Sequence, residues 1–450
     1  MITERIRNRL SFPYISILLL SLFCVLLSCQ ETYPDILEEV EEEVEVIFNL
    51  KASFIPSTYA PTTVDEKQIK EIDVLVFKVN NGEEFYAYRS QATANPEDNE
   101  YTVTLQKDLA NQYRFVVLVN ARGYIDRTLL PVDVLKESVL SGIESEVSGK
   151  WEGETIPMWG GKSDDTYFID EGVSIPAITL LRSLSRVDVI SKLPAGDFNL
   201  KEVYLYNWKT RGRIAPRTDH GYYDPVGYEA LKVSVPESRE GLTGDLPVRY
   251  EIENNENKIE KQVYLHEAGA PEGTNELDAT CLVVGGHYSS QPDITYYRID
   301  FQQKIDDQYT YIDVLRNHQY VMNIIGVEER GYETPDSAFY YKKANITVEI
   351  TTWNVGDLSD TNIGGNYDFS FSQSRFDLSP AIPEAVLKVV TDYPGEWTIE
   401  NQDPGLFSIE KRKDSVYISV NSSALSQSFT GAFRVKAGKF TKIISVYYTV

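Results

Sequence analysis

The side chains of this 450-residue chain that could do chemistry are four histidines, three cysteines and many carboxylates. His220, His266, His287 and His318 are scattered and match no spacing of zinc ligands. A pair of carboxylates hydrolyses a glycosidic bond only from opposing walls of a cleft, and the sequence singles out no such pair. The chain also has no nucleophile elbow, phosphate-binding loop or dinucleotide fingerprint. We therefore expect no catalytic residues, no cofactor and no metal site.

The cysteines divide into two near the N-terminus and one far from it. Cys24 lies inside an apolar leader, and Cys29 follows that leader directly. Cys281 stands in the apolar run Ala-Thr-Cys-Leu-Val-Val, which predicts a buried strand thiol, with a catalytic thiol as the alternative. Once the leader is removed, two cysteines remain, and they offer no disulfide framework.

The junction Ser28-Cys29 is the clearest chemical site of the sequence. A basic start precedes the mostly apolar run Ile15–Leu27, which has the length of a signal-peptide core and is too short to span a bilayer comfortably. A small residue before a cysteine at the end of such a core resembles a bacterial lipobox. The resemblance implies cleavage before Cys29 and acyl chains such as palmitate on it, each CH2 adding about 0.8 kcal/mol of membrane affinity. An ordinary secretory peptide is the alternative.

The composition is acidic, with a net charge of −25. The leader, residues 1–28, carries three arginines and one glutamate, a net +2, so the mature chain is near −27. Such a surface repels nucleic acid and anionic lipid heads, and we expect neither as a partner. The dense carboxylates of residues 29–43 predict an extended, solvated tether. A surface-export signal of the kind found behind the lipid cysteine of Bacteroidetes lipoproteins is the other interpretation of that segment.

Short strands with alternating polarity predominate after the tether. Val44–Phe54 predicts the first strand, and Ile72–Phe77 predicts a buried one, followed by the hairpin signal Asn80-Asn81-Gly82. Leu130–Ile143, with a proline near its start, is the one segment that predicts a helix. Further strand-like runs are Phe85–Tyr88, Tyr101–Leu105, Tyr113–Asn120, Ile178–Leu193, Phe198–Trp208, Gln262–His266, Thr280–Val284, Thr295–Phe301, Tyr309–Val314, Tyr320–Val327, Asn345–Trp353, Ala385–Thr391, Trp397–Glu400, Ser415–Val420, Gly431–Val435 and Lys442–Val450.

Five stretches, in this order and spacing, resemble the fimbrillins of Bacteroidetes, the pilin family of that phylum. The resemblance covers residues 44–355 and implies two tandem β-sandwich domains, export as a lipoprotein and assembly into a surface fibre. The five stretches are Ile72–Phe77, Ile156–Gly160, Leu181–Val189, Leu315–Ile324 and Ile346–Trp353.

The last part of the chain resembles a BACON-type domain, a family often linked to glycan binding. The likeness lies in the Gly-rich linker before it, the segment Thr391–Trp397 and a terminal alternating strand. Tyr393 and Trp397 are the candidate glycan contacts, because their rings could stack on a sugar face. For Trp397 we favour the alternative, packing in the core.

The predicted fold is mainly β, with two tandem fimbrillin-type β-sandwich domains of the transthyretin or Ig-like kind and a C-terminal Ig-like sandwich, after a lipoprotein signal peptide. The predicted segments are a signal peptide at 1–28, an acidic tether at 29–43, sandwich domains at 44–177 and 178–355, a linker at 356–367 and the BACON or Ig-like domain at 368–450.

The fimbrillin resemblance also implies how the protein would assemble. In that family, proteolysis after an arginine removes the first strand, and a neighbour's C-terminal segment takes its place. Here the loop Ile55–Lys70 has no arginine, and the first one after the leader is Arg89. Lys51, Lys67 and Lys70 are the basic residues nearby, so the chain departs from the family pattern at the processing step.

We therefore predict an accessory subunit, at the tip or the anchor of a fimbria on the outer membrane surface, that serves adhesion. Its partners would be other fimbrial subunits by strand exchange, the membrane through the lipid on Cys29, and host or microbial glycan or protein. Lys442–Val450 is expected to be the last domain's own strand, which argues against a stalk role. The alternative is a cell-surface lipoprotein that does not polymerise and that binds glycan through its C-terminal domain.

Overall fold

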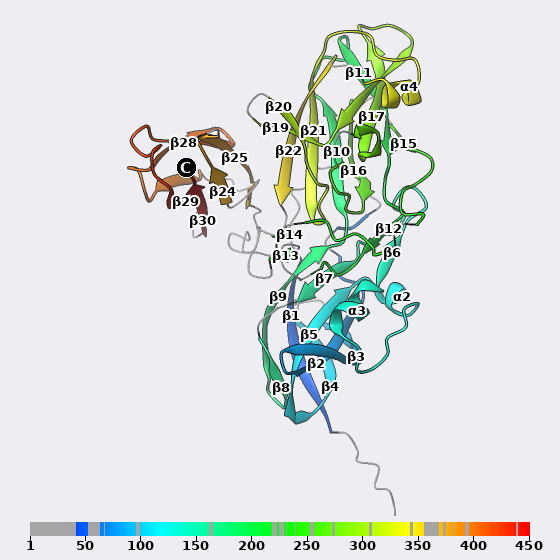
Figure 1. The fold of residues 1–450 in the computed structure, drawn as a ribbon, viewed down its shortest axis with the longest axis vertical. Coiled ribbons are helices and arrows are strands. Elements are labelled where there is room, and N and C mark those ends of the chain that lie inside the picture. The colour runs from blue at the N-terminus through cyan, green and yellow to red at the C-terminus, as the bar shows by residue number, and fades with distance from the viewer. Residues whose placement is uncertain are drawn as a thin grey trace, which may run out of the picture. The chain divides into compact units, whose positions relative to one another are not determined.

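The computed structural model shows a chain built mainly of strands, with short helices, as the alternating sequence predicts (Figure 1). Among the described residues, no helix is long and apolar enough to cross a membrane. The described residues are 42–52, 64–66, 68–95, 100–161, 165–217, 223–224, 229–230, 232–238, 240–252, 256–271, 275–305, 308–342, 345–354, 369–371, 375–380, 382–391, 396–437 and 440–450.

The first group of strands forms an eight-stranded sheet in the order β2-β3-β4-β1-β9-β7-β5-β8 (Figure 1). An additional pairing of β2 with β5 closes the sheet on itself around an apolar core. The strands are β1 (Glu43–Ala52), β2 (Ile72–Asn80), β3 (Glu83–Asn95), β4 (Glu100–Gln106), β5 (Asp108–Val119), β7 (Met158–Gly161), β8 (Tyr167–Ile169) and β9 (Ser174–Arg182).

The predicted hairpin at Asn80-Asn81-Gly82 is confirmed as the turn between β2 and β3. Asn81 and Gly82 have φ values of 53° and 85°, and Asn80 pairs with Glu83 across the turn. Two positive φ values in a row are what a type I′ turn needs, and Asn-Gly adopts them at little cost.

The predicted helix Leu130–Ile143 is wrong over its first half. The structure has helix α2 (Arg122–Ile125) before this segment and α3 (Lys136–Ser141) within it. Between them, the Tyr86 N–H donates to the Val134 carbonyl, and the Asp133 N–H donates to the Tyr86 carbonyl, each at 2.8 Å. These bonds hold the segment against β3 in place of a first helical turn, and Asp133 has a φ of 62°, which an α-helix does not allow.

The second group of strands forms two four-stranded sheets, in the orders β16-β10-β21-β22 and β15-β11-β17-β18 (Figure 1). One apolar core draws residues from both sheets, such as Val187 and Met322 from the first and Val203 and Val284 from the second. The strands are β10 (Ser185–Ser191), β11 (Phe198–Tyr206), β15 (Val248–Glu251), β16 (Lys258–Leu265), β17 (Cys281–Tyr288), β18 (Ile294–Asp300), β21 (His318–Val327) and β22 (Ile346–Asn354).

Smaller elements complete this group. Helix α4 (Pro335–Tyr340) packs against β17 and β18. The remaining elements are the paired strands β6 (Glu144–Glu146) and β12 (Arg211–Arg213), β13 (Tyr223–Asp224) and β14 (Glu229–Ala230), β19 (Gln302–Ile305) and β20 (Gln308–Tyr311), and the 3-10 turn η1 (Glu276–Asp278).

The run Ile178–Leu193, which the sequence suggested as one strand, is two strands in different sheets. β9 pairs with β1 and β7 of the first sheet as far as Arg182, and β10 pairs with β16 and β21. The chain changes sheet at Ser183–Leu184. The boundary expected between residues 177 and 178 therefore falls inside β9, because an unbroken apolar run does not mark where a strand changes partners.

The last group of strands forms two four-stranded sheets, in the orders β23-β25-β28-β27 and β24-β30-β29-β26, around their own apolar core. The expected linker at 356–367 lies outside the described residues. The strands are β23 (Phe369–Phe371), β24 (Arg375–Leu378), β25 (Glu384–Thr391), β26 (Thr398–Asn401), β27 (Phe407–Arg412), β28 (Ser415–Val420), β29 (Phe429–Ala437) and β30 (Phe440–Tyr448).

Candidate functional site

Strand β1 lies inside the first sheet, between two strands that are far from it in sequence. It pairs antiparallel with β4, from Glu43 opposite Gln106 to Asn49 opposite Glu100. On its other side it pairs parallel with β9. Both ladders are non-local, so no tight hairpin ties β1 to either neighbour.

The side chains of β1 alternate between core and solvent. Val44, Val46, Phe48 and Leu50 are at most 4% exposed, whereas Ile47 between them is 48% exposed. The Phe48 ring meets the Phe115 ring edge to face at 5.5 Å between centroids. Burying four such side chains stabilises the sheet by roughly 6–12 kcal/mol, at about 1.5–3 kcal/mol each. Without β1, β4 and β9 would border an apolar groove with open edges.

The described chain resumes after β1 at Val64, where a short segment is held firmly by other parts of the fold. Val64 is buried in a small apolar cluster with Trp151 and Leu184. The Asp65 N–H donates to the Glu154 carbonyl at 2.7 Å. None of these contacts involves β1, so the segment at Val64 is attached to the fold by contacts of its own.

Glu66 completes this attachment through a buried ion pair. Its carboxylate accepts two hydrogen bonds of 2.9 Å from Arg186 and one of 2.7 Å from the Tyr264 hydroxyl. Arg182 donates to the Glu66 carbonyl at 2.8 Å. Burial alone would raise the pKa of Glu66, but the positive charges of Arg186 and Arg182 hold that pKa below its ordinary value. Glu66 is therefore a carboxylate that stabilises the fold in its charged form.

The structure describes only some of the residues considered for lipidation and for proteolytic cleavage. Ser28, Cys29 and Lys67 lie outside the described residues. Lys70 forms an ion pair with Glu154 on the surface. Arg89 lies within β3, where it pairs with Asp73 at 2.7 Å and with Asp126 at 2.5 Å. An arginine paired inside a strand is a poor protease site, because a protease needs an extended segment that can leave the fold.

Of the two candidate glycan contacts in the last group of strands, Tyr393 lies outside the described residues. Trp397 is 6% exposed and belongs to the apolar core. Lys411 Nζ lies 3.9 Å from the centroid of the Trp397 ring and donates to its carbonyl at 2.6 Å. Packing in the core, the alternative for Trp397, is what the structure shows, and a sugar cannot stack on this ring as it stands.

The candidate catalytic groups are structural where the structure describes them. Cys281 is fully buried in β17, and burial raises the pKa of its thiol to about 12, so the thiolate is not populated. His266 is buried with no hydrogen-bond partner for either ring nitrogen among the described residues, and burial together with Arg316 lowers its pKa to about 3. No group of metal-ligating side chains occurs in the described part of the chain.

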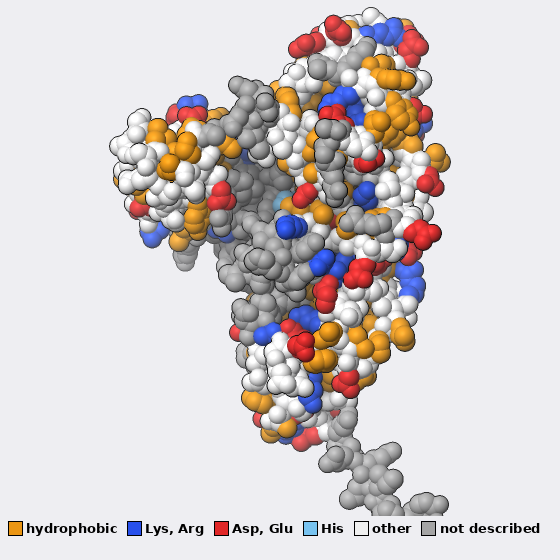
Figure 2. Space-filling model, in the orientation of Figure 1, with side chains coloured by type: hydrophobic (Ala, Val, Ile, Leu, Met, Phe, Trp, Pro, Cys, Tyr) orange, Lys and Arg blue, Asp and Glu red, His pale blue; other side chains and the backbone are white. Residues whose placement is uncertain are grey.

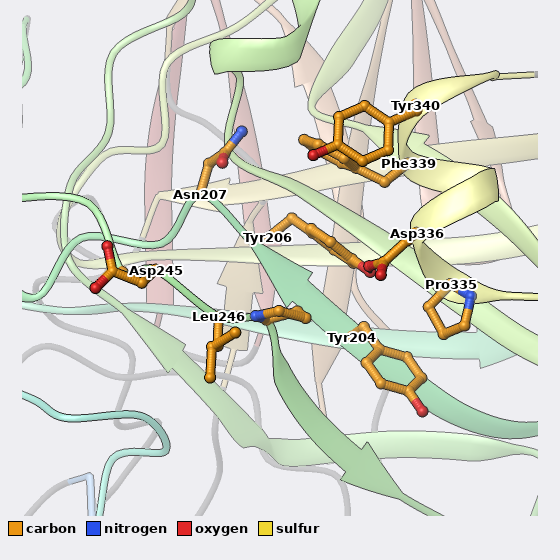
Figure 3. Close-up of a pocket in the computed structure, with 11 residues that line it drawn as sticks. Tyr204, Tyr206, Asn207, Asp245, Leu246, Pro335, Asp336, Phe339 and Tyr340 are labelled. Atoms are coloured by element: carbon orange, nitrogen blue, oxygen red, sulfur yellow. The ribbon is translucent and has the colours of Figure 1, made fainter.

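A pocket that sequence analysis missed lies beside α4, with a volume of about 500 Å³ (Figure 3). Three segments far apart in sequence line it, namely the end of β11, the loop before β15 and helix α4. Its lining combines aromatic rings with carboxylates. The lining residues are Tyr204, Tyr206, Asn207, Gly244, Asp245, Leu246, Pro247, Pro335, Asp336, Phe339 and Tyr340.

A hydrogen bond and a ring stack join β11 to α4 at the centre of this pocket. Tyr206 donates its hydroxyl to Asp336 Oδ1 at 2.7 Å, and its ring stacks on Phe339 with centroids 4.5 Å apart (Figure 3). Burial and the Asp336 carboxylate raise the pKa of Tyr206. Thr334 caps α4 by accepting from the Ser337 N–H, which fixes the first turn that carries Asp336. The sequence contains no local motif that predicts this pocket, because each of the three segments contributes only a few common residues.

Comparisons with known proteins find only distant similarity, and only among solved structures. No protein-family model and no curated protein matches it. The chain is similar to the solved structure of the tip fimbrial protein Mfa3 from Porphyromonas gingivalis with a C-terminal truncation, with 14% identity, 69% of this chain and 98% of that chain covered, and a TM-score of 0.43.

Two further solved structures resemble it. A candidate cell adhesion protein from Bacteroides eggerthii has 13% identity, covers 69% of this chain and 95% of its own, and gives a TM-score of 0.41. The fimbrial anchor protein Mfa2 from Porphyromonas gingivalis has 10% identity, 70% and 99% coverage and a TM-score of 0.31. At these identities and scores, the likeness assigns neither a function nor a partner to this chain.

Proposed function

We propose that this protein is an accessory subunit of a surface fimbria that serves adhesion and assembles by strand exchange, with β1 as the strand that is replaced. The observation that carries the proposal is the position of β1. It fills an apolar groove between β4 and β9, its partners are all remote in sequence, and the chain is held independently again from Val64.

The physical basis of strand exchange is that a donor can restore what β1 supplies. A donated strand gives the edges of β4 and β9 their backbone hydrogen bonds, and alternate apolar side chains fill the places of Val46 and Phe48. Because a donor that makes equal contacts gains about what β1 loses, the exchange is close to balanced in free energy. Removal of β1 by a protease would then favour the donor, and the protease here would not be one that needs an arginine in residues 55–70.

The position that we propose for the subunit in the fibre is supported by strand β30. β30 pairs with β29 and with β24, and Ile444, Val446 and Tyr448 on it are at most 1% exposed. Donating β30 would open that core, at roughly 1.5–3 kcal/mol for each side chain. A stalk subunit must donate a strand as well as accept one, whereas a tip subunit only accepts. We therefore propose the tip position, with the anchor as the second candidate.

Attachment to the outer membrane through Cys29 belongs to the same proposal. Cys29→Ala should abolish incorporation of a labelled fatty acid and release the protein from membranes, because acyl chains on that cysteine would supply the membrane affinity. A label that persists in the variant would contradict this. The alternative function, a lipoprotein that does not polymerise and binds glycan through residues 368–450, loses one of its contacts, because Trp397 is buried.

Strand exchange is tested by linking β1 to the sheet. Glu45 and Thr104 face each other across β1 and β4 and are both exposed, so Glu45→Cys with Thr104→Cys offers a disulfide on the solvent face. We expect the oxidised variant to be absent from native fimbriae and to enter them after reduction. Cys281 is buried and will not compete for the new thiols.

A matched control places the same kind of link where no exchange is proposed. Arg434→Cys with Ile443→Cys joins β29 to β30. This variant should enter fibres whether it is oxidised or reduced, as followed by immunogold labelling. Gold at distal ends supports the tip, and gold only at the cell surface supports the anchor. Gold along the shaft would contradict the argument from β30, and entry of the oxidised Glu45–Thr104 variant would contradict strand exchange.

A further inference from the structure

The pocket beside α4 has the volume of a small-molecule site (Figure 3). Its volume of about 500 Å³ lies within the usual range for ligand pockets. Two of its apolar side chains face solvent, because Tyr340 is 60% exposed and Leu246 is 77% exposed. These two side chains lie beside the stacked rings of Tyr206 and Phe339. Together they provide an apolar surface that a ligand could cover.

Asp336 and Asn207 are held by hydrogen bonds that leave each of them an oxygen able to accept another. Asp336 uses Oδ1 for the Tyr206 hydroxyl, and its Oδ2 has no hydrogen-bond partner in the described part of the chain. The Asn207 amide group donates to the Leu277 and Ala279 carbonyls at 2.6 and 2.8 Å, so its side-chain oxygen remains to accept. A ligand for this pocket must therefore bring donors.

The charge of the lining restricts the ligand further. Asp245 and Asp336 are the charged residues that line the pocket, and no lysine or arginine lines it among the described residues. An anionic ligand, such as an acidic sugar or a phosphate, would meet two carboxylates and no positively charged lining residue. Binding of an anion is therefore disfavoured on electrostatic grounds.

Binding of a cationic ligand is disfavoured because arginine side chains already lie on two of the aromatic rings. The Arg298 guanidinium lies 4.9 Å from the centroid of the Phe339 ring, which also stacks on Tyr206. The Arg249 guanidinium lies 6.0 Å from the Tyr204 ring. A cationic ligand would compete with these two arginines for the same π surfaces. The open Tyr340 ring is left for an uncharged, partly apolar surface.

We propose that this pocket binds a neutral sugar residue of a glycan. A pyranose ring offers an apolar C–H face to the exposed ring of Tyr340, and its hydroxyl groups donate to Asp336 Oδ2 and to the Asp245 carboxylate. Neutral sugars carry the donors that the pocket lacks, and they carry no charge. This proposal does not depend on fibre assembly, and it assigns glycan contact to the second group of strands.

The test uses the full chain and a panel of neutral methyl glycosides, those of glucose, galactose, mannose and N-acetylglucosamine. Saturation-transfer NMR should detect binding of at least one glycoside at millimolar concentration. Tyr340→Ala should weaken that binding by about tenfold, a change of 1.4 kcal/mol in affinity. Asp336→Asn should weaken it as well, because it removes the free carboxylate oxygen.

The matched control is Tyr309→Ala, since Tyr309 is 59% exposed, does not line the pocket and resembles Tyr340 in exposure. It should leave binding within about twofold of the wild type. If Asp336→Asn perturbs folding, the affinities of Tyr340→Ala and Tyr309→Ala for the glycoside are compared instead. The proposal is overturned if the full chain binds no glycoside, if Tyr340→Ala binds as the wild type does, or if methyl glucuronide or Nα-acetyl-lysine methylamide binds more tightly than every neutral glycoside.

Discussion

Strands β1 and β30 occupy matching positions in two different groups of strands. Each lies inside a sheet, between one antiparallel and one parallel neighbour, which are β4 and β9 for β1 and β29 and β24 for β30. Each also places alternate apolar side chains in a core, with Phe48 and Ile444 both fully buried. By burial and pairing alone, neither strand is more replaceable than the other.

The difference lies in connectivity. β30 follows β29 directly, with Ala437 paired to Phe440, so its antiparallel partner is its neighbour in sequence. β24 has no ladder partner other than β30 in the described part of the chain, whereas β4 still has β3, and β9 still has β7, when β1 is gone. A strand is replaceable when its partners are remote in sequence and are held in place by other strands. β1 meets both conditions, and β30 meets neither.

Phe48→Ala should have the largest effect of the single substitutions considered. It removes a fully buried ring that packs on Phe115, which costs about 3–5 kcal/mol. Ile47→Ala in the same strand is the control, because Ile47 is 48% exposed and its loss should cost about 0.5 kcal/mol or less. Native-state hydrogen exchange of β4 and β9 measures both variants. If Phe48→Ala and Ile47→Ala lowered the stability equally, the side chains of β1 would not be packed in the core as described.

Ile444→Ala repeats the comparison in β30. The residue is fully buried, and its truncation should cost about 2–4 kcal/mol. Its neighbour Ile443 is 55% exposed and serves as the control. Hydrogen exchange should show the loss in β29 and β24 and leave β4 and β9 unchanged. A loss that spreads to the first sheet would contradict the view that the two groups have separate cores.

Glu66→Gln should destabilise the protein by about 3 kcal/mol, because it leaves Arg186 and Arg182 without that carboxylate in a buried site. The pKa of Glu66 is depressed in the folded protein, so its stabilisation is complete above the unfolded pKa of about 4.3 and is lost as pH falls below it. The variant should therefore lose less stability than the wild type between about pH 4 and pH 2 in a urea titration. If the wild type and the variant lost the same stability between about pH 4 and pH 2, the role assigned to Glu66 would be contradicted.

Asp108→Asn should have the smallest effect. Although burial opposes it, hydrogen bonds from Asn111, Tyr113 and the Ala110 N–H lower the pKa of Asp108 to about 2. Its stabilisation should be complete above the unfolded pKa of about 3.9 and fade as pH falls toward 2. Because the site is only partly buried, we expect about 1 kcal/mol or less. Thermal melts at pH 6 and pH 2.5 would measure the difference, which should be clearly smaller at the lower pH.

The parts of the fold that follow from local chemistry could be predicted from the sequence. Asn80-Asn81-Gly82 predicts a turn because only a few residues tolerate two positive φ values. The alternation in Val44–Leu50 predicts a strand with one buried face, and the apolar run around Cys281 predicts a buried thiol. In each case the cause lies within a few residues of the effect.

The parts that depend on remote partners could not be predicted. The change of sheet at Ser183–Leu184 is decided by the partners of β9 and β10, and the extended start of Leu130–Ile143 by hydrogen bonds to Tyr86. The pocket beside α4 needs three segments that only the fold brings together.

The central claim, that β1 is replaceable and β30 is not, is tested most directly by complementation with peptides. One chain lacks residues 43–52, another lacks residues 440–450, and each is mixed with a synthetic peptide of the residues that it lacks. We predict that the β1 peptide binds its chain and restores hydrogen-exchange protection of β4 and β9, and that the β30 peptide fails to restore β24 and β29. Failure of the β1 peptide, or equal rescue by both peptides, would contradict the account.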